Sequence, residues 1–330
     1  RQGNDNLVAN AFLEWKMDSV TTLIFRPQYR TAANDRSSNG FQQGWGNDVL
    51  LNERESSGTT NNSSYNLTMM LKLSRKLSRM GRNIALKVDY GTNGSSTDRT
   101  SLSTTHYFKN NAKNVKNQKI EDRMEGYNYR LQLVYVEPLP WFHFLQFRYS
   151  YQHRVNNSDR FVYNWNKELE EFAPDYDEDA SNCFENQYSN HLFNLAVRTS
   201  RKNYNYNIGA DFEPQKSVSR SLLEKATPAE EPLRKSVFNI SPTVNFRYKF
   251  SKRTRLQIVY RGKSRQPNIR DLQPVTDRTN PLNIRVGNPS LKPSYTNTFT
   301  LNFNSYNTQN KQNLVASVLA EITITGINNQ

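Results

Sequence analysis

Residues 127–152 read YNYRLQLVYVEPLPWFHFLQFRYSYQ, and this stretch contains the same pattern twice. In 127–135 and again in 145–151, apolar or aromatic side chains take the odd positions, and most even positions are polar. A period of two places successive side chains on opposite faces of a β-strand. The stretch therefore predicts two antiparallel strands, each with one apolar and one polar face, joined by a turn that contains Pro138 and Pro140.

The same alternation recurs along the chain, and no helical pattern of useful length interrupts it. We predict twelve strands, at residues 7–15, 20–30, 64–74, 83–91, 126–136, 142–153, 188–199, 203–213, 236–250, 254–263, 294–304 and 312–324. Short turns join every second pair of neighbours, at 16–19, 75–82, 137–141, 199–203, 251–253 and 305–311. Long polar segments rich in Asn, Ser and Gly make the other connections, at 31–63, 92–125, 154–187, 214–235 and 264–293.

This asymmetry of turn length indicates the fold class. Outer-membrane barrels have short turns on the periplasmic side and long loops on the outside. Ten residues at ~3.3 Å each, tilted by ~40°, span about 25 Å, which is the height of the apolar band that such barrels present to lipid. We therefore expect an all-β, antiparallel, up-and-down transmembrane barrel, with the apolar face toward lipid and the polar face toward the lumen. The alternative is a soluble two-sheet protein that buries its aromatic residues in a core.

The composition favours the membrane barrel. Hydrophobic residues make up 35% of the 330 residues, and on the count that includes glycine but not tyrosine the fraction is about a third. Ordinary globular domains have about 45–50% on that count. Aromatic residues make up 12%, which argues against a disordered chain. A chain of this kind folds but cannot fill a large core.

The formal net charge is +14, which suits nucleic acid, an anionic membrane surface or an acidic partner. Binding of nucleic acid is not expected, because the aromatic residues lie on the strand face opposite the charges, whereas base stacking needs both on one surface. Cys183 is the only cysteine, so it has no partner for a disulfide within the chain. No signal peptide or transmembrane helix is visible, and we expect the chain to be a piece of a longer one.

Several motifs resemble a known family. Leu73-Ser-Arg-Lys-Leu-Ser-Arg-Met-Gly-Arg82 and Tyr135-Val-Glu-Pro-Leu139 resemble turns in outer-membrane β-barrel proteins of Bacteroidetes. The proline-rich segment between 265 and 293 is similar to the last long loop of TonB-dependent receptors. We expect this loop either to form a rigid cap over the barrel rim or to fold back, where it would narrow the channel mouth or present side chains to a ligand. The motif residues are Arg265, Pro267, Leu272, Pro274, Asn280, Pro281, Gly287, Asn288, Pro289, Leu291 and Pro293.

The resemblance implies part of a larger transporter barrel, with residues 1–330 as one partial barrel domain and no second domain. It also implies an N-terminal plug in the parent chain, the TonB complex, outer-membrane lipid and lipopolysaccharide as partners, and an unknown solute. Two alternatives stay open: a self-closed twelve-stranded channel, and a non-transporting surface barrel that serves as an adhesin or binding protein.

The polar face of the predicted strands is basic. Three acidic residues lie on it, at Glu14, Asp89 and Asp211. The eleven expected lumen-facing basic residues are Arg26, Arg30, Lys72, Lys87, Arg130, Arg148, Arg198, Arg247, Lys249, Arg255 and Arg261. A channel of one sign concentrates counter-ions, so this pattern favours an acidic plug or an anionic solute. The alternative is that these side chains only keep the wall hydrated.

Catalytic chemistry finds no support, and we expect neither enzymatic activity nor a cofactor. The four histidines show no metal-ligand spacing, and His143 and His191 are interpreted as interface side chains. Asp175, Asp177 and Asp179 match the start of a calcium loop, but Ala180 stands where glycine is expected and Asn186 where the bidentate glutamate is expected. This acidic stretch is therefore interpreted as a solvated extracellular loop.

Overall fold

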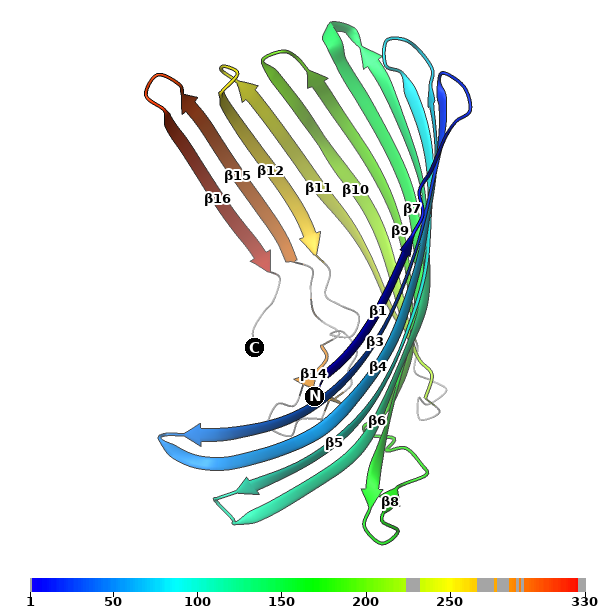
Figure 1. The fold of residues 1–330 in the computed structure, drawn as a ribbon, viewed down its shortest axis with the longest axis vertical. Helices are drawn as coiled ribbons and strands as arrows, with labels where there is room; N and C mark the ends of the chain where they lie inside the picture. The colour runs from blue at the N-terminus through cyan, green and yellow to red at the C-terminus, as the bar shows by residue number, and fades with distance from the viewer. Residues whose placement is uncertain are drawn as a thin grey trace.

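The computed structural model describes residues 2–223, 232–265, 276–277, 285–288, 291 and 294–325. Fourteen of the described strands build one curved antiparallel sheet, and the other two form a separate short pair (Figure 1). Twelve strands follow one another across it: β1 (Gln2–Asn10), β3 (Thr21–Gly46), β4 (Val49–Lys76), β5 (Asn83–Tyr107), β6 (Ala112–Leu139), β7 (His143–Asn166), β9 (Asn182–Ser200), β10 (Tyr204–Ser221), β11 (Leu233–Lys249), β12 (Thr254–Arg265), β15 (Ser294–Asn307) and β16 (Gln312–Thr325). Two short strands, β2 (Leu13–Lys16) and β8 (Glu171–Phe172), pair with β3 and β7.

The topology confirms the predicted meander. Every strand on this path pairs with its neighbour in sequence, and all pairs are antiparallel. The short connections lie together at one end of the sheet, which is the upper end in Figure 1. One of them contains a single turn of 3-10 helix, η1 (Pro140–Phe142).

The predicted strand at 7–15 appears as β1 and β2 because Pro27 faces its middle. Asn10 pairs with Gln28 and Leu13 pairs with Phe25, so the register is the same on both sides of the break. Between them, the Ala11 amide donates to the Pro27 carbonyl at 3.1 Å. Proline has no N–H to return the bond, which interrupts the ladder without ending the strand.

The connections at 31–63 and 92–125 differ from the expected loops. β3 and β4 continue to a two-residue turn at Asn47 and Asp48, whose φ angles of 47° and 62° are those of a tight hairpin turn. β5 and β6 likewise pair as far as Tyr107 and Ala112. These ends carry polar residues on both faces, because neither face meets lipid, so the sequence shows no alternation there.

The segment 154–187 is part strand and part folded lobe. β7 extends to Asn166 and β9 begins at Asn182. Between them the chain returns over β7, where the Val162 amide donates to the Ser181 hydroxyl at 2.9 Å and the Asp177 amide donates to the Val162 carbonyl at 2.6 Å. Val162 is fully buried as a result. The connections 214–235 and 264–293 are only partly within the described residues.

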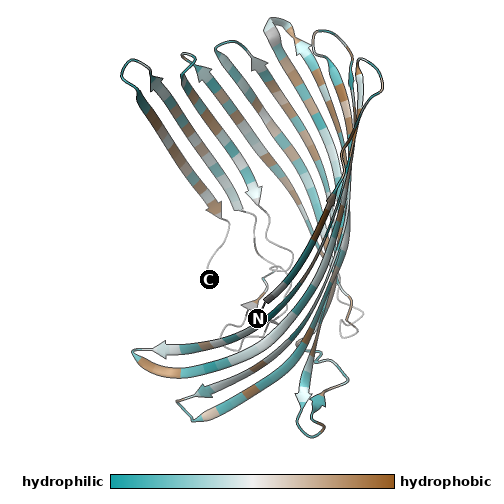
Figure 2. Cartoon of the chain, viewed as in Figure 1, coloured by the Kyte–Doolittle hydropathy of each residue, from teal (hydrophilic) through white to brown (hydrophobic). Residues whose placement is uncertain are grey.

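One face of the sheet carries the apolar residues predicted to face lipid. Residues directly opposite in a ladder share a face, and a row of six runs across six strands: Leu73, Leu86, Leu133, Tyr149, Phe193 and Phe212. Alternating hydrophobic and hydrophilic residues along β9–β12 are visible in Figure 2. At the alternating apolar positions that are expected to face lipid, none of the following side chains is buried: Leu86, Val88, Leu131, Leu133, Phe147, Tyr206, Ile208, Val244, Phe246, Phe299 and Leu301. They form no closed core, which argues against the soluble two-sheet alternative.

The sheet is open at both edges within the described residues. β1 pairs only with β3, and β16 pairs only with β15. The twelve strands as described therefore do not form a self-closed channel. The sheet also splits between β11 and β12. These strands pair only from Lys249 to Thr243, and Pro242 is the first residue of β11 beyond this pairing, although β10 still pairs with β11 as far as Leu233. Proline at this position lacks the amide that the next ladder bond needs.

Candidate functional site: the polar face of the sheet

The structure places all eleven predicted basic residues on the face opposite the apolar row. The ladder partners fix this placement: Lys72 lies opposite Lys87, Lys87 opposite Gln132, and Gln132 opposite Ser150. At the far side, Lys249 lies opposite Arg255. Within the predicted strand bounds, the ladder also places one further basic residue, Lys263, and two further acidic residues, Glu213 and Glu321, on this face. The face therefore remains basic.

Few of these cations are neutralised by a carboxylate. Lys87 forms an ion pair with Asp89 at 2.8 Å, and Arg148 forms one with Asp211 at 3.2 Å. Asp211 also accepts a hydrogen bond from the Asn194 amide at 2.7 Å. None of the other nine predicted basic residues makes an ion pair within the described part of the chain.

Other basic side chains of this face lie against neutral groups. The Arg130 guanidinium donates to the Gln152 carbonyl oxygen at 2.5 Å. Arg26 lies 4.7 Å from the centre of the Phe12 ring, in the cation–π range. Neutral partners hold the guanidinium groups in place and leave their charge uncompensated, so an anion can still approach them.

A hollow of about 920 Å³ lies on the polar face near the first strands. Phe12, Arg26, Met70, Lys87 and Asp89 are among its lining residues. It combines an aromatic ring, an apolar thioether and two cations with one carboxylate. Such a surface suits an anionic group attached to an apolar body.

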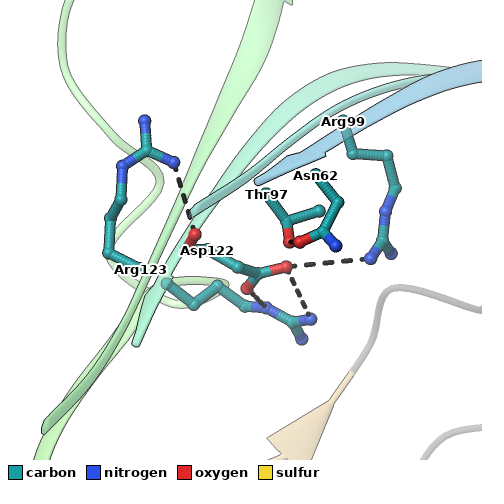
Figure 3. Close-up of polar contacts among 6 residues, drawn as sticks. Asn62, Thr97, Arg99, Asp122 and Arg123 are labelled. Atoms are coloured by element: carbon teal, nitrogen blue, oxygen red, sulfur yellow. Dashed lines mark hydrogen bonds and ion pairs between the residues drawn. The ribbon is translucent and has the colours of Figure 1, made fainter. Parts of the chain in front are cut away.

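A second polar cluster lies on the strand extensions and was not predicted. The Asp122 carboxylate on β6 accepts two hydrogen bonds from the Arg160 guanidinium on β7, at 2.7 and 3.4 Å. Arg99 of β5 reaches the same carboxylate at 3.7 Å. Figure 3 shows these contacts beside the bond of 2.8 Å from the Thr97 hydroxyl to the Asn62 side chain. Their ladder positions place them on the polar face, so this face continues beyond the apolar band.

The proline-rich loop motif is only partly described. Arg265 ends β12, and Gly287 and Asn288 follow β14 (Arg285–Val286), which pairs with β13 (Thr276–Asp277). The Leu291 amide donates to the Asn288 carbonyl at 3.3 Å, and the Lys235 ammonium donates to the Leu291 carbonyl at 2.6 Å. Lys235 lies on the polar face of β11, so the end of the loop is held against that face. Pro267, Leu272, Pro274, Asn280, Pro281, Pro289 and Pro293 lie outside the described residues.

His143 and His191 lie on the apolar face, as predicted for interface side chains. The His191 ring shares a hydrogen bond of 2.9 Å with the Tyr149 hydroxyl, and the His143 ring shares one of 2.8 Å with the Tyr206 hydroxyl. In the acidic lobe, Asp177 accepts bonds from the Asp179 and Ala180 amides, both at 3.1 Å. Its carboxylate thus caps a turn within this loop.

Cys183 lies beyond the apolar band, opposite Asp159 in the ladder between β7 and β9. Burial, together with the nearby Asp159 carboxylate, raises the pKa of the thiol to about 11. The thiol is therefore protonated at pH 8. We expect it to react with a thiol reagent about 100-fold more slowly in the folded than in the unfolded protein, since each pKa unit lowers the thiolate fraction about tenfold. Mass spectrometry of the peptide that contains Cys183 measures this, and equal rates in both states would contradict it.

Within the described residues, no helix is long and apolar enough to cross a membrane. Comparison of the sequence with family models gives one match, over residues 75–329, to the family described as "Outer membrane protein beta-barrel family". No curated protein matches the chain.

Solved structures with similar folds are outer-membrane receptors. The pyoverdine receptor FpvA from Pseudomonas aeruginosa PAO1, bound to pyoverdine, matches 96% of this chain and 50% of its own, with a TM-score of 0.53 and 10% identity. The P. aeruginosa FpvA complex with a heterologous pyoverdine matches 96% and 47%, with a TM-score of 0.50 and 9% identity. The chain therefore spans about half the length of these receptors. The likeness is one of fold.

Proposed function

Because the chain belongs to the outer membrane protein beta-barrel family, we propose that it forms part of the wall of an outer-membrane transporter that takes up an anionic solute with energy supplied through TonB. An integral outer-membrane barrel presents its apolar face to lipid and its polar face to the lumen. The basic residues of the polar face would then line the path of the solute. The excess of basic residues on this face is the observation that carries the proposal.

The predicted acidic partner of this lining follows from electrostatics. Cations in a water-filled lumen repel one another over the screening length of about 8–10 Å. Lys72 opposite Lys87, and Lys249 opposite Arg255, are close enough for this repulsion to matter. An N-terminal plug with acidic residues, an anionic solute, or both in turn would relieve it.

The hydrogen bond from Lys235 to Leu291 supports a role for the proline-rich loop in controlling access of the solute to the lumen. The contact from Lys235 to Leu291 draws the chain after β14 toward the polar face. We propose that the proline-rich segment folds back over the mouth of the lumen. Proline fixes φ, so such a segment holds its shape better than the Ser- and Asn-rich connections do.

The open edges of β1 and β16 require partners in the membrane. Unpaired backbone groups cost several kcal/mol each in hydrocarbon, and open sheet edges do not occur there. We propose that further strands of the parent polypeptide pair with both edges and close the barrel. The lengths of the receptors with similar folds leave room for such strands.

A non-transporting surface barrel is the second candidate. The lobe between Asn166 and Ser181 favours it, because the lobe is folded rather than loose. Trp165 and Phe172 pack edge to face with 5.0 Å between their ring centres, and the ring centres of Phe161 and Tyr176 are 5.3 Å apart. A rigid, acidic lobe at the outer end would suit recognition of another macromolecule.

Depletion of solutes from a defined mixture separates the two candidates. Cells that lack the gene, and cells that lack TonB, are grown in medium with matched anionic, neutral and cationic oligosaccharides and peptides. We expect the same anionic compounds to remain in both cultures, as measured by mass spectrometry. Depletion equal to that of the parent strain would rule out uptake. Loss of surface adhesion alone would then favour the second candidate.

A further inference from the structure

The short connections at one end of the sheet carry most of the excess positive charge of the chain. A lumen lining along the strands does not account for this charge. We define the short-turn rim as residues 16–20, 75–82, 137–142, 201–203, 250–253 and 306–311. It holds ten basic residues and two acidic ones. The long segments 31–63, 92–125, 154–187, 214–235 and 264–293 together hold 21 basic and 22 acidic residues. The two ends of the sheet therefore differ in charge.

Both carboxylates of the rim are already engaged. Asp18 accepts bonds from the Val20 and Thr21 amides, at 2.7 and 2.6 Å. Glu137 pairs with Arg82 and also accepts a bond from the Tyr135 hydroxyl. Within the described part of the chain, neither carboxylate forms an ion pair with another cation of the rim. Among the described residues, Lys16, Lys76, Arg79, Lys202, Lys252 and Lys311 make no ion pair.

The rim also exposes large apolar side chains beside these cations. Trp141 is 80% exposed and Met80 is 78% exposed. Leu77, Phe250 and Tyr306 are exposed as well. An exposed apolar group next to a long cationic side chain is typical of a membrane–water interface. There the apolar part enters the lipid, and the ammonium or guanidinium reaches the headgroup region.

We propose that the short-turn rim binds the anionic headgroups of the phospholipids that surround this end of the barrel. The rim continues directly from the apolar face, so lipid already lies against it. Its cations are spread over five connections, as a lipid ring requires, and are not gathered into the single patch that a protein partner would contact. Their charge is complementary to phosphate. The inference depends on the membrane location of the barrel and not on what the barrel transports.

Fluorescence quenching tests this proposal, because Trp141 lies in the rim. Full-length protein is reconstituted in phosphatidylcholine bilayers that contain brominated phosphatidylglycerol or brominated phosphatidylcholine. The Trp141 signal is the difference between the wild type and Trp141→Phe. A Lys near an anionic surface changes partition by a factor of about five. We expect phosphatidylglycerol to quench preferentially, and the preference to fall by about fivefold or more in Lys76→Gln/Lys202→Gln/Lys252→Gln.

The matched control removes the same charge from the opposite end, in Lys109→Gln/Lys113→Gln/Lys167→Gln, and should keep the wild-type preference. High salt should weaken the wild-type preference, which tests the proposal even where the triple variant folds poorly. An unchanged preference in the rim variant, or an equal loss in the control, would overturn the proposal. So would binding of a soluble polyglutamate peptide that depends on the three lysines while the lipid preference does not, because the rim would then serve an acidic protein.

Discussion

Replacing Leu133 by arginine should lower the free energy of unfolding of the barrel by about 2–4 kcal/mol, the cost of a basic side chain near the bilayer midplane. Leu133 on β6 lies directly opposite Leu86 on β5 and Tyr149 on β7. On its own strand it lies between Tyr135, near the short turn, and Tyr129, toward the long ends. The side-chain oxygen of the apolar row nearest to Leu133, the Tyr149 hydroxyl, already shares a hydrogen bond of 2.9 Å with His191, so the arginine would have to bend toward an interface.

Urea titration of the full-length protein folded into lipid vesicles measures this cost through tryptophan fluorescence. The control is Gln132→Arg, one residue away on the polar face. Its guanidinium would face water, and Asp89 would partly offset the repulsion from Lys87, so we expect a change within about 1 kcal/mol. Equal costs for the two variants would mean that lipid does not distinguish the two faces.

The twelve strands could be predicted because lipid imposes the alternation on them. Between Tyr135 and Tyr129, each odd position of β6 faces hydrocarbon and each even position faces water, so the sequence itself records the strand. The same logic located the basic residues of the polar face. The pleat of a strand places alternate residues on opposite faces. The register between strands then decides which faces coincide, and Lys72 lies directly opposite Lys87 on the same face.

The strand extensions could not be predicted because this constraint is lost beyond the lipid. Thr59 and Thr100 lie opposite each other, and their hydroxyl groups share a hydrogen bond of 2.7 Å, yet their neighbours on both faces are also polar. A run of Ser, Thr and Asn is typical of a loop as well as of a strand in water. The network around Asp122 depends on the register of three such strands, so no local pattern indicates it.

The hydrogen bond between Lys235 and Leu291 of the proline-rich loop could not be predicted from the sequence, for a different reason. Lys235 and Leu291 are 56 residues apart, and the contact joins a side chain to a backbone carbonyl. A carbonyl acceptor is present in every residue, so the sequence contains no signal for the partner. The prolines predict a stiff segment, but the position of Leu291 follows only from the polar face on which Lys235 lies.

Reversing three charges of the polar face should slow uptake of the anionic solute by about tenfold or more, since a lining of one sign raises counter-ion concentration by roughly 10- to 1000-fold. The variant is Lys72→Glu/Arg130→Glu/Arg247→Glu. None of these residues makes an ion pair within the described part of the chain, so no carboxylate is left without its partner. The measured quantity is the initial uptake rate of each anionic compound that wild-type cells deplete.

Position, rather than net charge, is what this prediction tests. Lys109→Glu/Lys113→Glu/Lys167→Glu changes the net charge by the same amount at the outer ends of the strands and should leave the rate within about twofold, because at physiological salt charges are screened beyond about 8 Å. Lowering the ionic strength lengthens the screening distance to about 30 Å at 0.01 M, so the difference between wild type and the polar-face variant should widen there. Equal slowing in both variants would assign the effect to the overall charge of the surface. Unchanged uptake in both would mean that the basic residues only hydrate the wall.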